Sequence, residues 1–168
     1  MNQCEWIVCE RRGLWTAALR VARGRQASLS PHAPRIYEVR SLGELAERLT
    51  MRPVSLVLVE VHASNFGDVL RWLADSSRSF PQARFAALLD ETVRQPKSRG
   101  KNSPVATIDI LASLYESGIA DFADSPRRLH HVFALAEKHA AVIADARSDE
   151  SQSITDWAWS QLPWQTDS

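Results

Sequence analysis

The apolar run at residues 56–61 (LVLVEV) constrains the fold of this chain more than any other stretch. It is short, rich in β-branched residues and almost unbroken, which is typical of a strand that is buried on both faces of a parallel sheet. A single acid, Glu60, stands near its end. Open α/β sheets place their functional groups at the carboxyl ends of the strands. The run therefore predicts a central parallel strand that carries one carboxylate to the functional edge.

Segments with strand character alternate with segments of helical spacing along most of the chain. Such alternation predicts βα units, whose right-handed crossovers put helices on both faces of a parallel sheet. We therefore predict a single, doubly wound α/β domain of flavodoxin type, with five strands in the order 2-1-3-4-5 and a C-terminal tail. The expected strands are 5–10, 35–40, 56–61, 83–89 and 120–123.

Start and stop signals define the expected helices. Ser41 and Glu44 form a capping-box pattern at the start of the second helix, and Asn65 stands at the start of the third. Ser125 and Pro126 have the N-cap and N1 pattern and predict the start of the last helix. For the first helix we expect a buried stripe and a terminating glycine; the residues are Leu14, Ala17, Ala18, Val21 and Gly24.

Composition limits the classes of function. The chain has 168 residues, which suits one domain (1–146) and an appendage (147–168). Lys+Arg and Asp+Glu both number 20, so the net charge is zero and a general nucleic-acid binder is not expected. No apolar run approaches the ~20 residues of a membrane span, and the start lacks the pattern of a signal peptide. Cys4 and Cys9 would face opposite sides of one strand, which disfavours a disulfide and suits a cytoplasmic location.

A second stretch adds to this pattern. Residues 118–126 (GIADFADSP) join a short strand to a Ser-Pro helix start. Together with the acid-bearing run at 56–61, this stretch resembles strand five of a response-regulator receiver domain, and the resemblance covers about residues 4–145. It implies a signalling domain of the CheY kind, in which an aspartate after strand three accepts a phosphoryl group beside Mg²⁺.

The residues at the receiver's phosphorylation positions differ from the family pattern. The phospho-accepting aspartate falls on Glu60, and the acidic pair of strand one falls on Cys9 and Glu10. Leu89, or Asp90 after a one-residue shift, replaces the hydroxyl residue of strand four, and Ser125 replaces the lysine. Two further positions match the family: Phe122 for the aromatic that rotates on activation, and Pro126 for the proline after the lysine.

These replacements predict a pseudo-receiver that cannot be phosphorylated in the usual way. Glu60 is one methylene longer than aspartate, the Mg²⁺ site lacks one acid, and the fixed positive charge of the lysine is gone. We therefore expect no enzyme activity, no metal and no cofactor, and a signalling partner protein or a homodimer. The alternative is a small enzyme or ligand-binding protein of flavodoxin fold, with its site at the Glu10/Glu60 edge; its candidate polar groups are Glu10, Glu60, His62, Ser64 and Asp90.

Each candidate residue also has a plainer interpretation. Glu60 is either a carboxylate hydrogen-bonded to nearby backbone N–H groups or a built-in mimic of the phosphorylated state. Glu10 is either a surface residue or a weak cation ligand beside Glu60. Cys9 is either a small buried residue or a redox thiol. Arg11 and Arg12 are either solvated loop residues or neutralise Glu60.

The tail is the second informative feature of the chain. Three of the six tryptophans lie in its last twelve residues, although disordered tails are poor in aromatic residues. Large aromatic side chains dominate protein interfaces. We expect the tail to fold back on its own domain, to dock on a partner protein, or to pack across a homodimer; the docking residues are Trp157, Trp159, Leu162 and Trp164.

Overall fold

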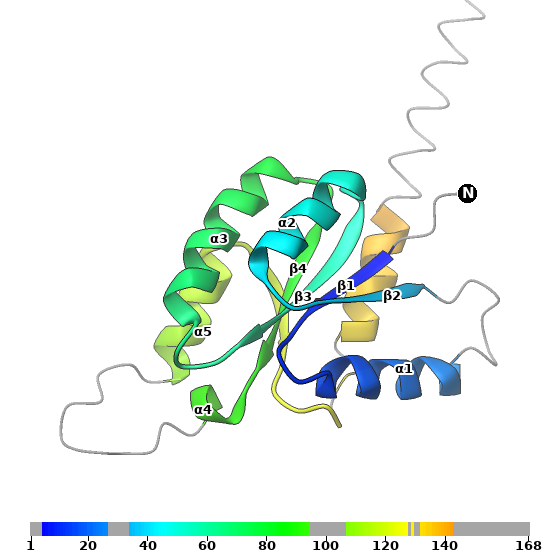
Figure 1. Cartoon of the computed structure of the whole chain (residues 1–168), viewed down its shortest axis with the longest axis horizontal. Helices are drawn as coiled ribbons and strands as arrows, with labels where there is room; N and C mark the ends of the chain where they lie inside the picture. The colour runs from blue at the N-terminus through cyan, green and yellow to red at the C-terminus, as the bar shows by residue number, and fades with distance from the viewer. Residues whose placement is uncertain (1–4, 27–33, 95–106, 128, 130–131, 143–168) are drawn as a thin grey trace, which may run out of the picture.

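The computed structural model describes residues 5–26, 34–94, 107–127, 129 and 132–142. A five-stranded parallel sheet forms its centre, in the order β2-β1-β3-β4-β5 (Figure 1). This is the fold class and the strand order predicted from the sequence. The strands are β1 (Glu5–Cys9), β2 (Arg35–Val39), β3 (Ser55–Val61), β4 (Arg84–Leu89) and β5 (Ile119–Ala123).

Helices cover both faces of the sheet, which gives three layers (Figure 1). On one face lie α2, α3 and α5, with the short α4 at its margin; on the other lie α1 and the last described helix, 132–142. The helices that carry labels are α1 (Leu14–Gln26), α2 (Leu42–Met51), α3 (Phe66–Ser79), α4 (Glu91–Arg94) and α5 (Thr107–Glu116).

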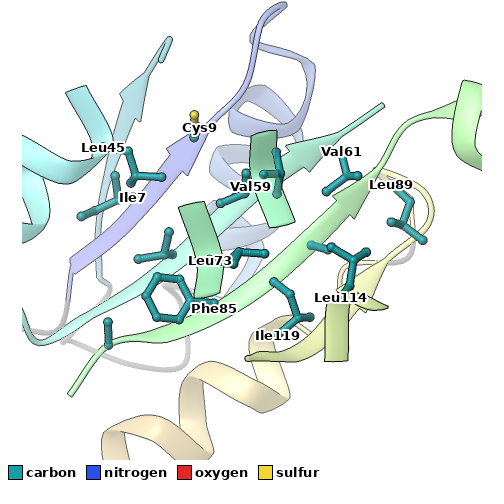
Figure 2. Packing of buried hydrophobic residues seen from close by; sticks show 14 of the residues in the cluster. Ile7, Cys9, Leu45, Val59, Val61, Leu73, Phe85, Leu89, Leu114 and Ile119 are labelled. Atoms are coloured by element: carbon teal, nitrogen blue, oxygen red, sulfur yellow. The ribbon is translucent and has the colours of Figure 1, made fainter. Parts of the chain in front are cut away.

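Alternation along the strands divides the core into two clusters, because successive side chains of a strand point to opposite faces. In β3, Val57, Val59 and Val61 pack under α2, α3 and α5, and Figure 2 shows part of this cluster. Leu56 and Leu58 point to the other face, toward α1 and helix 132–142. Every residue of β3 is buried, as expected for a central parallel strand.

This alternation also decides where the edge residues point. Cys9 lies in the cluster under α2, α3 and α5. Glu60 continues the series of Leu56 and Leu58, so its side chain leaves the strand on the α1 side. Glu10 follows Val8 in the same way. The two acids of the edge are thereby directed to the α1 side of the sheet.

The first helix differs from its prediction in two respects. Gly24 lies inside α1 rather than at its end, because the helix continues to Gln26. The expected stripe was also wrong: Leu14 and Val21 are exposed, and the helix buries Trp15 and Leu19 against the sheet. Two arcs of this helix carry apolar residues, and the arc with the bulkier side chains faces the core.

Helix starts agree with the sequence in one case and differ in two. The Ser41 hydroxyl accepts a hydrogen bond from the Glu44 N–H at 3.2 Å, which confirms that cap. Asn65 occupies the N-cap position of α3, but its side chain makes no capping hydrogen bond. Residues 126–127 form a turn and residue 129 is not helical, so the last helix starts after 129 and not at Ser125.

Two further sequence predictions concern the whole chain. Among the described helices, none is long and apolar enough to cross a membrane. The predicted boundary between the domain and the tail, at 146/147, lies outside the described residues, as do Cys4 and the tail itself.

Candidate functional site

The carboxyl edge of the sheet gathers the predicted site residues. The β1/β3 register pairs Cys9 with Val59, and the β3/β4 register pairs Glu60 with Leu88. A hydrogen bond from the Asp90 N–H to the Val61 carbonyl, at 2.9 Å, holds the β4–α4 loop against the end of β3. The sequence prediction that these strand ends share one edge is therefore confirmed.

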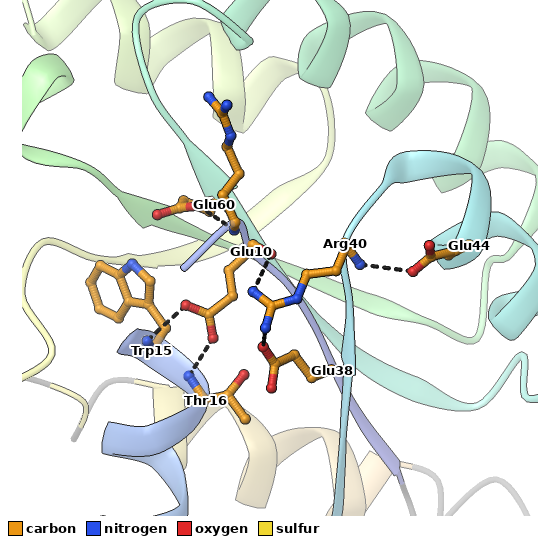
Figure 3. Close-up of polar contacts among 8 residues, drawn as sticks. Glu10, Trp15, Thr16, Glu38, Arg40, Glu44 and Glu60 are labelled. Atoms are coloured by element: carbon orange, nitrogen blue, oxygen red, sulfur yellow. Dashed lines mark hydrogen bonds and ion pairs between the residues drawn. The ribbon is translucent and has the colours of Figure 1, made fainter. Parts of the chain in front are cut away.

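Glu10 is the most constrained side chain at this edge. It is only 2% exposed, so the expectation of a surface position was wrong. Its carboxylate accepts hydrogen bonds from the backbone N–H groups of Trp15, at 2.8 Å, and of Thr16, at 2.5 Å (Figure 3). Both groups belong to the first turn of α1, where N–H groups have no partner within the helix. Glu10 therefore caps α1 with a charged acceptor.

The local sequence explains why an acid outside the helix takes this role. Gly13 precedes α1 and has φ +74°, a conformation that L side chains rarely adopt. Its carbonyl accepts the first helical hydrogen bond, from Ala17, but glycine has no side chain to cap the free N–H groups. The tight turn at Gly13 brings the Glu10 carboxylate to these groups instead.

Main-chain contacts fix Glu10 as well. Its N–H donates to the carbonyl of Val39 at 3.2 Å, and its carbonyl accepts from the Arg40 guanidinium at 3.3 Å. Arg40 also forms an ion pair with Glu38 (Figure 3). Backbone and carboxylate of Glu10 are thus both held by the protein.

Glu60 is buried and also bonds to main chain. Its carboxylate accepts a hydrogen bond from the Arg11 N–H at 2.8 Å, which is the plainer of the two arrangements expected for this residue. Its carbonyl accepts from the side-chain amide of Asn65 at 2.9 Å, and the Asn65 side-chain oxygen accepts from the His62 N–H at 2.9 Å. Asn65 therefore braces the β3–α3 loop instead of capping α3.

The two acids do not form a cation site with other groups. Within the described residues, no cluster of three or more His, Cys, Asp or Glu side chains is arranged to hold a metal ion. The Glu10 carboxylate uses both oxygens at the start of α1, and that of Glu60 uses one on Arg11. A Mg²⁺ ion needs several oxygen ligands in near-octahedral geometry, which this arrangement does not provide.

Cys9 lies between these acids on the opposite face of β1. Burial raises the pKa of its thiol to about 12, and the carboxylates of Glu44, Glu60 and Glu10 add to this increase. The thiolate is the reactive form of cysteine, so this environment suppresses nucleophilic and redox chemistry. Cys9 is a buried residue, as the plainer interpretation expected.

The end of β4 has no hydroxyl at the expected position. Leu89 is buried in the core, whereas Asp90 is the first polar residue of the loop. A hydrogen bond from the Thr92 N–H, at 2.8 Å, is the main cause that lowers the pKa of the Asp90 carboxyl, and nearby Arg12 adds a smaller contribution. The Thr92 hydroxyl in turn accepts from the Ala63 N–H at 3.1 Å.

Thr92 was missed in the sequence analysis. It lies three residues beyond Leu89 in an unpredicted helix of four residues, and it joins the β4–α4 loop to the β3–α3 loop. The Asp-x-Thr pattern after a strand is the signal that could have identified it, because an aspartate often accepts from the N–H two residues later.

The β5 positions lie at the far side of the same edge. The Ser125 hydroxyl accepts from the Arg127 N–H at 3.2 Å, so it stabilises a turn. Phe122 is half-buried and packs edge-on against Tyr115 of α5, with 6.4 Å between ring centroids. Its role as a switch aromatic stays a prediction.

An enzyme at this edge would need a different constellation. The Ser64 hydroxyl lies 2.7 Å from Nδ1 of His62, on the exposed β3–α3 loop. Among the described residues, no carboxylate is hydrogen-bonded to His62 to orient it as a general base. The pair is explained as a local loop contact between residues two apart. Trp157, Trp159, Leu162 and Trp164, the predicted docking residues, lie outside the described residues.

Comparisons with known proteins agree with this architecture. No protein-family model matches the sequence, and no curated protein matches it. Among solved structures, a response regulator from Thermotoga maritima matches with a TM-score of 0.58 and 16% identity, over 83% of this chain and 99% of that one. A CheY-like protein, TadZ, from Pseudomonas aeruginosa PAO1 matches with a TM-score of 0.52 and 13% identity, over 79% of this chain and 91% of that one.

The fold is therefore that of a CheY-like receiver domain. At these identities the likeness carries the fold alone, because one fold supports many functions. What the chain does must be argued from the residues at the carboxyl edge.

Proposed function

We propose that this chain is a pseudo-receiver: a non-catalytic signalling or scaffolding module that acts through protein–protein contacts and is not regulated by aspartyl phosphorylation. The observation that carries the proposal is the engagement of both edge acids with main chain. Glu10 caps α1, and Glu60 accepts from the Arg11 N–H. In this arrangement the acids stabilise the β1–α1 turn, which is a structural task.

Phosphoryl transfer places demands that these residues do not meet. The reaction needs a divalent cation to neutralise charge on the phosphoryl group and a nucleophile held in line. A longer side chain at position 60 displaces the nucleophilic oxygen by ~1 Å, and misplacement on that scale can cost ~10²-fold in rate. Ser125, in a turn after β5, offers no positive charge. These properties support loss of the phosphorylation switch.

A carboxylate fixed at position 60 also suggests how such a module would behave. If its charge substitutes for a phosphoryl group, the domain is held in one state and binds its partner constitutively. The partner is a signalling protein or a second copy of the chain. A cytoplasmic location stays a prediction.

Treatment with small phosphodonors and Mg²⁺ tests the loss of phosphorylation. We expect the intact mass of the full chain to be unchanged, while an active receiver domain treated in parallel gains a phosphoryl group. Stoichiometric modification at Glu60 would overturn the proposal.

The role of the Glu60 charge is tested separately. Glu60→Gln keeps the side-chain length and an acceptor for the Arg11 N–H, so the fold should persist. If the charge defines the signalling state, this variant changes the association constant for the partner or for self-association. Glu47→Gln, on the exposed side of α2, is the matched control. An unchanged association constant for Glu60→Gln would leave Glu60 a purely structural role.

A further inference from the structure

Helix α1 presents an apolar stripe to solvent. Trp15 and Leu19 cover the sheet, while Leu14 is 58% exposed, Val21 is 60% exposed, and Ala17 between them is also exposed. At 3.6 residues per turn, these three exposed residues fall within an arc of about 60°, on the side of the helix that faces away from the sheet. Single exposed apolar residues are ordinary, but a continuous stripe on one helix indicates a contact surface.

The surroundings of this stripe are strongly basic. Residues 11–26 contain five arginines and no acid, although the whole chain has zero net charge. Arg11, Arg12 and Arg20 are exposed, and the one acid nearest the start of the helix, Glu10, is buried beneath it. The natural occupant of such a surface is an apolar segment with acidic residues.

The end of the same chain has this composition. Residues 148–168, which lie outside the described residues, contain no Lys or Arg. Their apolar side chains are concentrated in the segment 154–164, and indole rings also attract arginine guanidinium groups through cation–π contacts. Four acids lie in or around that segment; they are Asp149, Glu150, Asp156 and Asp167.

We propose that the segment 154–164 docks on the outer face of α1 in the same molecule, with its tryptophans on the Leu14–Val21 stripe and its acids near the flanking arginines. Helix 132–142 packs beside α1 on one face of the sheet, so the tail leaves the described domain from the same layer (Figure 1).

The chain is long enough for this contact. Between 142 and 157 an extended chain spans up to about 50 Å, whereas a domain of this size is roughly 40 Å across. Tethering at this length gives the tail a local concentration near the millimolar range, which favours its own α1 over that of another copy. Docking would cover the basic stripe and shield it from other acidic surfaces.

The proposal can be tested by NMR on the ¹⁵N-labelled full chain. The six indole N–H signals are assigned by single Trp→Phe substitutions, and their exposure is measured with a soluble paramagnetic agent. We expect the signals of Trp157, Trp159 and Trp164 to be protected. In the Leu14→Ser/Val21→Ser double variant, the ratio of docked to free tail should fall by about tenfold or more, because burial of either exposed side chain contributes roughly five- to tenfold.

Controls separate this contact from its rivals. Met51→Ser alters an equally exposed apolar residue, 64% exposed at the end of α2, and should leave the tail signals protected. Tail indoles that are accessible in the wild-type protein, or protected in both the wild-type and the double variant, would overturn the proposal. Protection that disappears on dilution would assign the tail to a second copy. Binding of anionic vesicles with release of the tail indoles, at physiological salt, would assign the stripe to a membrane surface; either result overturns docking within one molecule.

Discussion

At the scale of single residues, Glu10 illustrates how a binding position becomes structural. A glycine in the left-handed region starts α1 and cannot cap it, so the nearest acid supplies both oxygens to the first turn. The same turn brings the Arg11 N–H to Glu60. Both acids therefore stabilise the loop that a receiver would use to hold its metal.

The first prediction concerns this cap. Glu10→Gln keeps the shape of the side chain but removes the charge and replaces one acceptor with a donor, which leaves an N–H of Trp15 or Thr16 unpaired. We expect the free energy of unfolding to fall by about 1–3 kcal/mol. Urea denaturation measures the change, with Glu47→Gln as the exposed control. A stability equal to that of the wild-type protein would mean that Glu10 does not cap α1.

The second prediction concerns Cys9. Its pKa of about 12 leaves almost no thiolate at neutral pH. Iodoacetamide should therefore label Cys9 in the native protein far more slowly than after denaturation, as judged by peptide mapping that resolves it from Cys4. Rapid native labelling would revive the redox interpretation of this thiol.

At the scale of elements, the strands follow from the sequence and one helix face does not. A fully buried strand such as β3 has only one reasonable interpretation, because both its faces are apolar. In α1 the periodicity fits either of two arcs, one with Leu14 and Val21 and the other with Trp15 and Leu19. Helical spacing cannot decide between them, and the sheet selects the arc that buries the larger volume.

The candidate site was predictable to the same extent. Cys9, Glu60 and Leu89 follow from strand ends, which the apolar runs define. The orientation of Glu10 depends on the turn at Gly13, and the Thr92 contact depends on how two loops meet. Neither is encoded in a local pattern, so the sequence placed Glu10 at the surface.

Helix 132–142 carries the third prediction. His139 is 4% exposed, and neither ring nitrogen has a hydrogen-bond partner among the described residues. Burial lowers the pKa of His139, and the neighbouring charge of Arg84 lowers it further; the backbone of Ser55 opposes the shift without forming a hydrogen bond of normal geometry. The folded state therefore favours the neutral ring.

The direction of the pH effect follows from this shift. The contribution of neutral His139 to stability is complete above its unfolded-state pKa of about 6.5 and decreases as the pH falls below that value. His139→Leu removes the titrating group, so its unfolding free energy should depend less on pH between about 6.5 and 5. Thermal unfolding over this range measures the difference between the two proteins. Parallel pH curves would show that His139 does not titrate on unfolding.

At the scale of the whole molecule, the charge distribution is more informative than the total. The chain is neutral overall, yet the α1 segment is basic and the last twenty residues are acidic and aromatic. The carboxyl edge has lost the groups of a phosphorylation switch, so contact surfaces are what remains for regulation. A tail that covers α1 would make access to that helix depend on a partner that binds the tail.

The fourth prediction follows from such docking. Deleting residues 150–168 should lower the thermal midpoint, because the truncated protein exposes the α1 stripe and loses the burial of its indoles. Each kcal/mol lost corresponds to roughly 2–4 °C for a chain of this size. Deleting only 165–168, which contains no tryptophan, is the matched control and should leave the midpoint unchanged.

A double-mutant cycle then separates docking on α1 from any other effect of the tail. In the Leu14→Ser/Val21→Ser background the contact is already broken, so removing 150–168 should cost little further stability. Two sites that contact each other show such non-additivity, whereas independent sites add within about 0.3–0.5 kcal/mol. Equal losses from the deletion in both backgrounds would mean that the tail stabilises the domain elsewhere. No loss in either background would mean that the tail contributes nothing to the stability of the isolated molecule and serves only an external partner.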